Sequence, residues 1–360
     1  MTEPVAVPRP RRPGRGVVAA VLAASVLLGV ATGAMVATAR DRPNSPGSVP
    51  TTARPTPTPS ATTTYAPLPR SAAPLDDDQF VVPRGPKDDT RLYLARVAGP
   101  VAPQRLSSPK GEKVNSPTLS ADRRTLIYVD RTTQRLRTMA ADGSHDQQLF
   151  DGLPTRCDEI WHVSWSRTDP TTLVIRCTSA SGPNRLMVID LEGTVIRMLA
   201  DPHEYLDDPV ISPDGQLVAY WAADASSGSP GGGAIYTRRV DGSDAPRRLT
   251  RPTAGRDADP AWSPDGSQIA FRRRISERDL DVFRMRSDGS GETRVVGGPS
   301  TDEKPLWSPD GRQLMIISNR TDSGEVGSTD DLYLVDAAGG RLEPLGLGAA
   351  EISTPVWSAR

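Results

Sequence analysis

The stretch that decides the fold runs Asp259-Pro260-Ala261-Trp262-Ser263-Pro264-Asp265-Gly266-Ser267-Gln268-Ile269-Ala270-Phe271. It predicts a short strand, a tight turn at residues 263–266 and a second strand with alternating apolar residues. In the turn, Pro264 fixes φ, Asp265 can accept hydrogen bonds from nearby backbone, and Gly266 can adopt the positive φ that completes the reversal. Two apolar segments around such a turn indicate a β-hairpin.

The first strand of this hairpin recurs along the chain. Each copy ends in a serine, and these serines lie about 45–50 residues apart, a period typical of four-stranded propeller blades. After the hairpin, each repeat predicts a third strand, a Gly-containing turn and a short fourth strand. The serines that end the six copies are Ser120, Ser166, Ser212, Ser263, Ser308 and Ser358.

The sixth repeat is divided between the two ends of the chain. Residues 354–360 supply only a first strand, whereas residues 79–82, 91–99 and 104–106 read as a second, third and fourth strand. Together they would complete one blade and remove the open edges of a five-blade array. The sequence therefore predicts an all-β fold over residues 79–360, a six-bladed β-propeller closed by three N-terminal strands plus one C-terminal strand.

The segment before the propeller begins with a predicted membrane helix. Residues 17–39 carry no charge and would span about 34 Å as a helix, enough to cross a bilayer. Residues 1–16 contain four arginines, which favour a cytoplasmic N-terminus and an exported remainder. We interpret residues 17–39 as an uncleaved, single-pass signal anchor. The alternative is a signal peptide cleaved after Ala39, which would make the protein secreted.

Residues 40–78 follow as a linker rich in Pro, Thr, Ser and Ala. This composition cannot form a packed core and predicts a disordered, extended spacer. The spacer would hold the propeller away from the membrane.

The repeats resemble the C-terminal β-propeller of the TolB family, whose blades carry the pattern Pro-x-Trp-Ser-Pro-Asp-Gly-x-x-Ile-Ala-Phe. The resemblance covers residues 79–360; it is strongest at 259–271, 305–317 and 209–220 and degenerate at 117–128 and 163–175. It implies a propeller fold, a location outside the cytoplasm and binding of a protein partner in the cell envelope. The anchor and spacer stand where TolB has an N-terminal α/β domain, an arrangement that resembles envelope proteins of actinobacteria.

The chain has two cysteines, Cys157 and Cys177. Cys157 precedes the first strand of the second repeat, and Cys177 ends its second strand, so the two Cα atoms can come within the separation that a disulfide needs. Outside the cytoplasm such a bond would persist. Two buried free thiols are the alternative.

Acidic residues gather before each predicted first strand. Because the first strands of a propeller line its central channel, we expect these carboxylates to ring one channel mouth. They could form a negatively charged funnel that binds a cation or a basic segment of a partner. Alternatively, each could hydrogen bond to backbone amides of the neighbouring blade. The candidate residues are Glu159, Asp208, Asp259, Glu303 and Glu351.

Loops that break the repeat are further candidates, because loops carry function more often than scaffold does. Such loops are 223–233 in the third repeat and 319–328 in the fifth. The run Arg272-Arg273-Arg274 is interpreted as a solvated blade face.

The sequence favours no catalytic role, cofactor or metal. It lacks a Gly-x-Ser-x-Gly motif, and only His162 of the three histidines is expected to face the channel. The net charge of −1 provides no general attraction for nucleic acid. The predicted function is a non-catalytic protein-interaction propeller tethered to the cell membrane. The alternatives are a sensory or small-ligand-binding propeller and, less favoured, a lyase or hydrolase with its site in the channel.

Overall fold

The computed structural model describes residues 68–69, 73–86, 89–98, 102–106, 113–179, 182–199, 201, 203, 205–223, 232–252, 255–321, 326–347 and 351–357. All regular elements among them are β-strands. Within this part of the chain, no helix is long and apolar enough to cross a membrane. The predicted membrane helix at 17–39 lies outside it.

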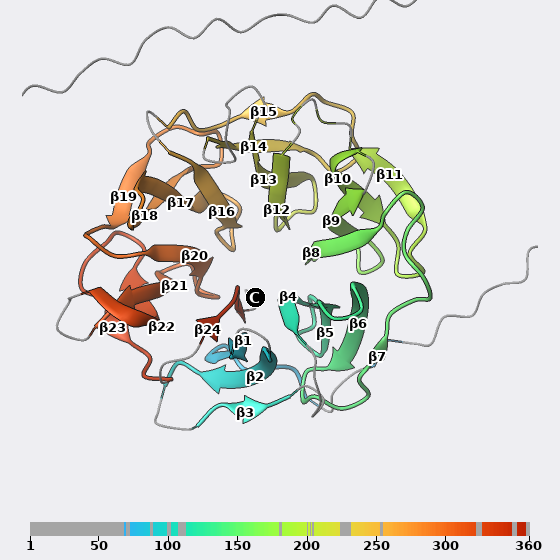
Figure 1. The fold of residues 1–360 in the computed structure, drawn as a ribbon, viewed down its shortest axis with the longest axis horizontal. Coiled ribbons are helices and arrows are strands. Elements are labelled where there is room, and N and C mark those ends of the chain that lie inside the picture. The colour runs from blue at the N-terminus through green and yellow to red at the C-terminus, as the bar shows by residue number, and fades with distance from the viewer. Residues whose placement is uncertain are drawn as a thin grey trace, which may run out of the picture. The chain divides into compact units, whose positions relative to one another are not determined.

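The strands form six sheets arranged in a ring (Figure 1), which confirms the predicted six-bladed propeller. Blade 1 comprises β4 (Val114–Leu119), β5 (Thr125–Asp130), β6 (Arg135–Ala140) and β7 (Gln147–Gln148). Blade 2 comprises β8 (Glu159–Trp165), β9 (Leu173–Ser179), β10 (Gly182–Ile189) and β11 (Val195–Leu199). Blade 3 comprises β12 (Tyr205–Ile211), β13 (Leu217–Ala223), β14 (Ala234–Arg239) and β15 (Arg247–Arg248).

Blades 4 and 5 follow the same order. Blade 4 comprises β16 (Asp257–Trp262), β17 (Gln268–Ser276), β18 (Asp279–Arg286) and β19 (Thr293–Val296). Blade 5 comprises β20 (Asp302–Trp307), β21 (Gln313–Arg320), β22 (Val326–Asp336) and β23 (Glu343–Pro344). In each blade the first strand lies nearest the axis and the fourth at the rim (Figure 1).

Blade 6 closes the ring as predicted. Its N-terminal strands are β1 (Gln79–Gly85), β2 (Arg91–Arg96) and β3 (Gln104–Arg105). Its inner strand comes from the C-terminal segment in two pieces, β24 (Glu351–Ile352) and β25 (Val356–Trp357). Both pieces pair with β1 in antiparallel fashion.

Two of the repeated tryptophans join neighbouring blades. Trp262 Nε1 donates to the carbonyl oxygen of Val210 at 3.1 Å, and Trp307 Nε1 donates to that of Ala261 at 3.0 Å. In both cases the indole and the carbonyl that accepts from it belong to successive blades, so each hydrogen bond is an inter-blade contact. The other two tryptophans at this position bond elsewhere: Trp165 Nε1 donates to the Pro170 carbonyl of its own blade at 2.9 Å, and Trp357 Nε1 donates to the Asp77 carbonyl before β1 at 2.7 Å.

A short segment before β1 packs on the ends of the blades that carry the Ser-Pro-Asp-Gly turns, here called the turn face. Thr125 Oγ1 donates to the Pro69 carbonyl at 2.5 Å, and Leu75 N donates to the Arg123 carbonyl at 3.0 Å. Arg123 also pairs with Asp77 at 2.6 Å. Contacts with the propeller therefore begin within the segment that the sequence assigned to the linker.

Candidate functional site

The face opposite the turn face, here called the mouth face, is where the inner strands begin. In four of them a non-glycine residue has positive φ, between 48° and 54°, and the register shifts at that point. Such a bulge turns one side chain away from its ordinary place in the pleat. The four residues are Ser116, Asp208, Asp259 and Lys304.

These bulges contribute to a ring of six side chains, one from each blade, around the channel. The ring opens onto a cavity of about 160 Å³, and a layer of one valine and five prolines lies next along the strands. The ring thus places polar and charged groups beside an apolar collar. Its six members are Ser116, His162, Asp208, Asp259, Lys304 and Thr354.

Lys304 links the two carboxylates of this ring. Its Nζ lies 2.5 Å from Asp259 Oδ1 and 3.3 Å from Asp208 Oδ1. Burial alone would lower the pKa of Lys304, but Asp208 and Asp259 raise it, so the ammonium stays charged. One cation therefore ties together the inner strands of blades 3, 4 and 5.

Arg272 extends the network around the channel. Its Nε lies 2.6 Å from Asp259 Oδ2, and its Nη1 lies 3.1 Å from Glu303 Oε2. The Asp259 side chain is only 2% exposed, so both cations compensate an almost fully buried charge.

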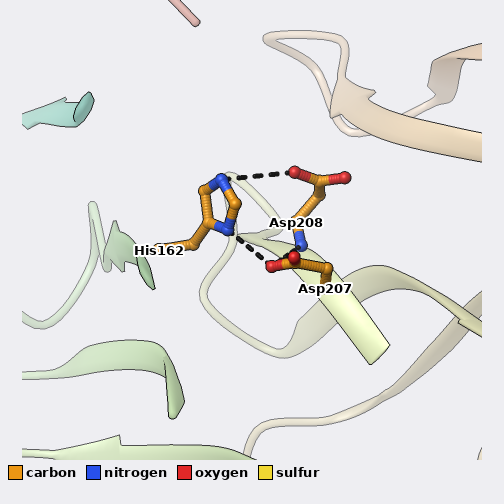
Figure 2. A group of neighbouring side chains, drawn as sticks. All are labelled: His162, Asp207 and Asp208. Carbon is orange, nitrogen blue, oxygen red and sulfur yellow. Dashed lines mark hydrogen bonds and ion pairs between the residues drawn. The ribbon is translucent and has the colours of Figure 1, made fainter. Parts of the chain in front are cut away.

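His162 closes the other end of the network. Its Nδ1 lies 2.5 Å from Asp207 Oδ1, and its Nε2 lies 3.4 Å from Asp208 Oδ1; Figure 2 shows the imidazole between the two carboxylates. Arg176 Nε lies 3.6 Å from Asp207 Oδ1. Every carboxylate around His162 thus has a second cationic neighbour, either Arg176 or Lys304.

His162, Asp207 and Asp208 also form a possible donor set for a metal ion, because one ligand atom from each lies within 4.8 Å of the others. An imidazole nitrogen and carboxylate oxygens would suit a divalent transition metal. However, Lys304 and Arg176 contact the same two carboxylates. A metal ion would have to compete with both cations, so the arrangement fits an ion-pair network better than a metal centre.

This geometry predicts a pH dependence of stability. Burial opposes charge on His162, but Asp207 and Asp208 outweigh it and raise its pKa above the ordinary 6.5. The stabilisation is therefore fully present below about pH 6.5 and is lost as pH rises through the folded-state pKa. We expect the difference in free energy of unfolding between wild type and His162→Gln to shrink as pH rises above about 6.5 and through the folded-state pKa, measured by urea denaturation.

The control for this prediction is Asp207→Asn. Burial would raise the pKa of Asp207, but His162 and Arg176 lower it to about 2. Removal of its charge takes away the contact that most favours protonated His162, so substitution of His162 in this background should give a weaker pH dependence. A difference between wild type and His162→Gln that stays constant with pH would contradict the prediction.

The predicted mouth residues do not all line the channel. Asp208 and Asp259 line the cavity, and Glu303 lies beside them on Arg272. Glu159 instead accepts a hydrogen bond from Trp161 Nε1 at 3.0 Å. Glu351 belongs to β24 in its backbone, and its side chain lies outside the described structure.

For Asp208 and Asp259, the contacts differ from both predicted roles. Asp208 and Asp259 join blades through Lys304, and their charge is compensated rather than free to form a negative funnel. Serine hydroxyl groups instead accept hydrogen bonds from backbone amides of the next blade. Ser116 Oγ accepts from Val163 N at 3.1 Å, and Ser164 Oγ accepts from Ile211 N at 3.0 Å.

The interpretation of the arginine run as a solvated blade face is wrong for two of its members. Arg272 and Arg273 have side chains only 13% and 14% exposed, and both form ion pairs. Arg272 belongs to the mouth network, whereas Arg273 points into blade 4 and pairs with the fully buried Asp257. Alternation along β17 sends neighbouring arginines to different faces, so the run is not one surface.

The predicted disulfide is confirmed. Cys157 and Cys177 are bonded, with their Cα atoms 5.6 Å apart, and both are buried. The bond fixes the segment before β8 to β9, so it constrains the start of the inner strand that carries His162.

Comparison with known proteins places this geometry in a family. Residues 171–360 match the TolB beta propeller domain. The chain belongs to this family. The match spans more than half of the chain and confirms the resemblance found in the repeats.

Individual TolB relatives match this chain over different lengths. A TolB homologue of Chlorobaculum tepidum is 29% identical over 169 residues, which are 47% of this chain and 37% of that protein. The chain therefore matches about a third of that relative's length. The crystal structure of TolB from Acinetobacter baumannii is similar to this chain with a TM-score of 0.61 at 20% identity. The matched region covers 78% of this chain and 66% of that TolB chain.

The propeller is also similar to an enzyme. An oligogalacturonate lyase solved in complex with manganese has a TM-score of 0.53 at 16% identity, covering 77% of this chain and 76% of that chain. At this level of identity the likeness concerns the fold alone.

Proposed function

We propose that this TolB-type propeller is a non-catalytic module outside the cytoplasm that is tethered to the membrane by residues 17–39 and binds a protein partner of the cell envelope. The observation that carries the proposal is the composition of the mouth face. This face combines the compensated charge network with exposed apolar side chains. A protein interface needs both, because apolar anchor residues are surrounded there by polar ones.

The apolar side chains lie at strand ends around the mouth. Five large hydrophobic side chains are exposed among the described residues, and three of them are Tyr205, Ile275 and Val326, with exposed fractions of 39%, 45% and 52%. They belong to the mouth-face ends of β12, β17 and β22, in three successive blades. Three exposed apolar side chains on the same face as the charge network support a docking face rather than scattered surface residues.

The mouth face also carries a tryptophan that is contacted by two arginines. The Arg131 guanidinium lies 3.3 Å from the centroid of the Trp161 ring, and Arg176 lies 5.2 Å from it. Tryptophan and arginine are enriched at interface hot spots. This pair therefore extends the proposed docking face across blades 1 and 2.

The proposal predicts a position-dependent cross-link in the native envelope. A photoreactive amino acid at Ile275 or Val326 in the full-length chain should give a discrete adduct with a protein partner, because both side chains are exposed at mouth-face ends of their strands. The readout is a shifted band, identified by mass spectrometry.

The matched control is the same amino acid at Arg312, which is 86% exposed and lies by the turn of blade 5 on the opposite face. Adducts of equal yield at Arg312, or none at Ile275 and Val326, would overturn the proposal. A stoichiometric transition metal in the purified protein would favour the lyase or hydrolase alternative instead.

A further inference from the structure

The outer strand of blade 2 differs from the outer strands of the other blades. β11 has five residues, Val-Ile-Arg-Met-Leu, whereas β3, β7, β15 and β23 have two each and β19 has four. Proteins usually protect sheet edges with short strands or charged side chains. β11 is longer, and it carries a single charged residue.

The edge of β11 is open within the described part of the chain. β11 pairs with β10 on one side and is the last strand of its sheet, at the outer rim of the ring (Figure 1). Ile196 and Met198 on this strand are 54% and 36% exposed, and among the described residues they are the two exposed large hydrophobics that do not lie on the mouth face. A free main-chain edge with apolar side chains at alternate positions is a template for another strand.

Arg197 supplies a charge between the two apolar residues. Its stem packs near Gly242, and it lines, with Ile196, a groove of about 340 Å³ between blades 2 and 3. No carboxylate among the described residues pairs with it. By contrast, Arg294 on β19 pairs with Asp281 at 3.2 Å.

We propose that β11 is a strand-addition site that takes an extended segment of a partner protein with apolar residues at alternate positions and an acidic residue between them. The apolar residues would cover Ile196 and Met198, and the acidic residue would lie across from Arg197, where an opposite charge is favourable and a like charge is not. The disulfide in the same blade links the segment before β8 to β9, on the inner side of the sheet that would receive the partner segment.

A second copy of this chain fits the site less well. An antiparallel pair of two β11 strands with Ile196 across from Met198 would also place Arg197 across from Arg197. Like charges directly across from each other destabilise a strand pair. Charge complementarity therefore favours an acidic partner segment.

The test uses two synthetic peptides and the full-length chain. One peptide alternates valine with glutamate, and the other alternates valine with lysine; binding is measured by fluorescence anisotropy. We expect the glutamate peptide to bind wild type at least about fivefold more tightly than the lysine peptide. Arg197→Glu should reverse this order, and Ile196→Lys/Met198→Lys should abolish binding of both.

Arg247→Glu on the exposed two-residue strand β15 is the matched control and should leave both affinities unchanged. Circular dichroism establishes that each variant is folded; these side chains are exposed, so their substitution should not affect folding. Equal affinities for the two peptides, no binding up to about 1 mM, or an unchanged order in Arg197→Glu would overturn the proposal. A concentration-dependent dimer that is lost in Ile196→Lys/Met198→Lys would overturn it in favour of self-association.

Discussion

Replacement of Arg273 by methionine is expected to lower the free energy of unfolding by about 3–5 kcal/mol. Arg273 Nε and Nη2 donate to Asp257 at 2.7 and 2.8 Å, and Asp257 is fully buried in blade 4. Methionine keeps much of the side-chain volume but leaves a buried carboxylate without its cation, which is the costly way to break such a pair. Urea denaturation followed by tryptophan fluorescence measures the change.

Two further variants isolate the cause. Arg274→Met changes the next arginine, which lies on the other side of β17. Its Nε lies 3.4 Å from the Ser276 carbonyl oxygen, and it forms no ion pair among the described residues, so the substitution should cost under about 0.5 kcal/mol. Asp257→Leu combined with Arg273→Met should recover most of the loss, because the corresponding position of blade 3 holds the buried Leu206. A double variant as unstable as Arg273→Met would show that the buried carboxylate is not the cause.

Removal of the disulfide should have the next largest effect. Cys157→Ala/Cys177→Ala is expected to lower the free energy of unfolding by about 3 kcal/mol, because the bond closes a loop with a sequence separation of 20 residues and restricts the unfolded chain. The measurement is urea denaturation of both proteins under oxidising conditions.

Reductant provides the control for this prediction. Dithiothreitol should lower the stability of the wild type to that of the double variant and leave the variant unchanged. A variant as stable as the oxidised wild type would contradict a stabilising role for the bond.

The propeller could be predicted from sequence because its signals are local and repeated. Each Ser-Pro-Asp-Gly turn fixes one hairpin through two or three residues, and the spacing between turns fixes the blade. The closure of blade 6 could also be predicted. The C-terminal segment offers only a first strand, and the N-terminal segment offers only the second to fourth strands, so each supplies what the other lacks. The disulfide followed from the register of a single hairpin.

The charge network of the mouth was harder to predict because its members are far apart in sequence. His162 and Asp208 contact each other across blades, 46 positions apart, and no local motif marks the pair. Alignment of the repeats does place His162, Asp208, Asp259 and Lys304 at one equivalent position. This shared position was the signal from which a ring of side chains could have been predicted. A search for acidic residues alone misses it, because one of the aligned residues is Lys304.

The backbone bulges explain why neighbouring acids behave differently. Asp257 and Asp259 lie two residues apart on β16, so their side chains would be on the same face of a regular strand. Because the register shifts between Ala258 and Ala261, Asp259 instead lines the channel while Asp257 points into the blade. The positive φ of Asp259 does not follow from its residue type, so composition alone could not separate the two roles.

The packing of the segment before β1 has a mechanical consequence. Pro69, Leu75 and Asp77 are held by Thr125 and Arg123 of blade 1, whereas the strand that follows them belongs to blade 6. A pulling force applied from the N-terminal side would therefore load the hairpin of blade 1 before it reached β1. Because β1 is the strand that pairs with both C-terminal pieces, this attachment shields the seam of the ring from tension.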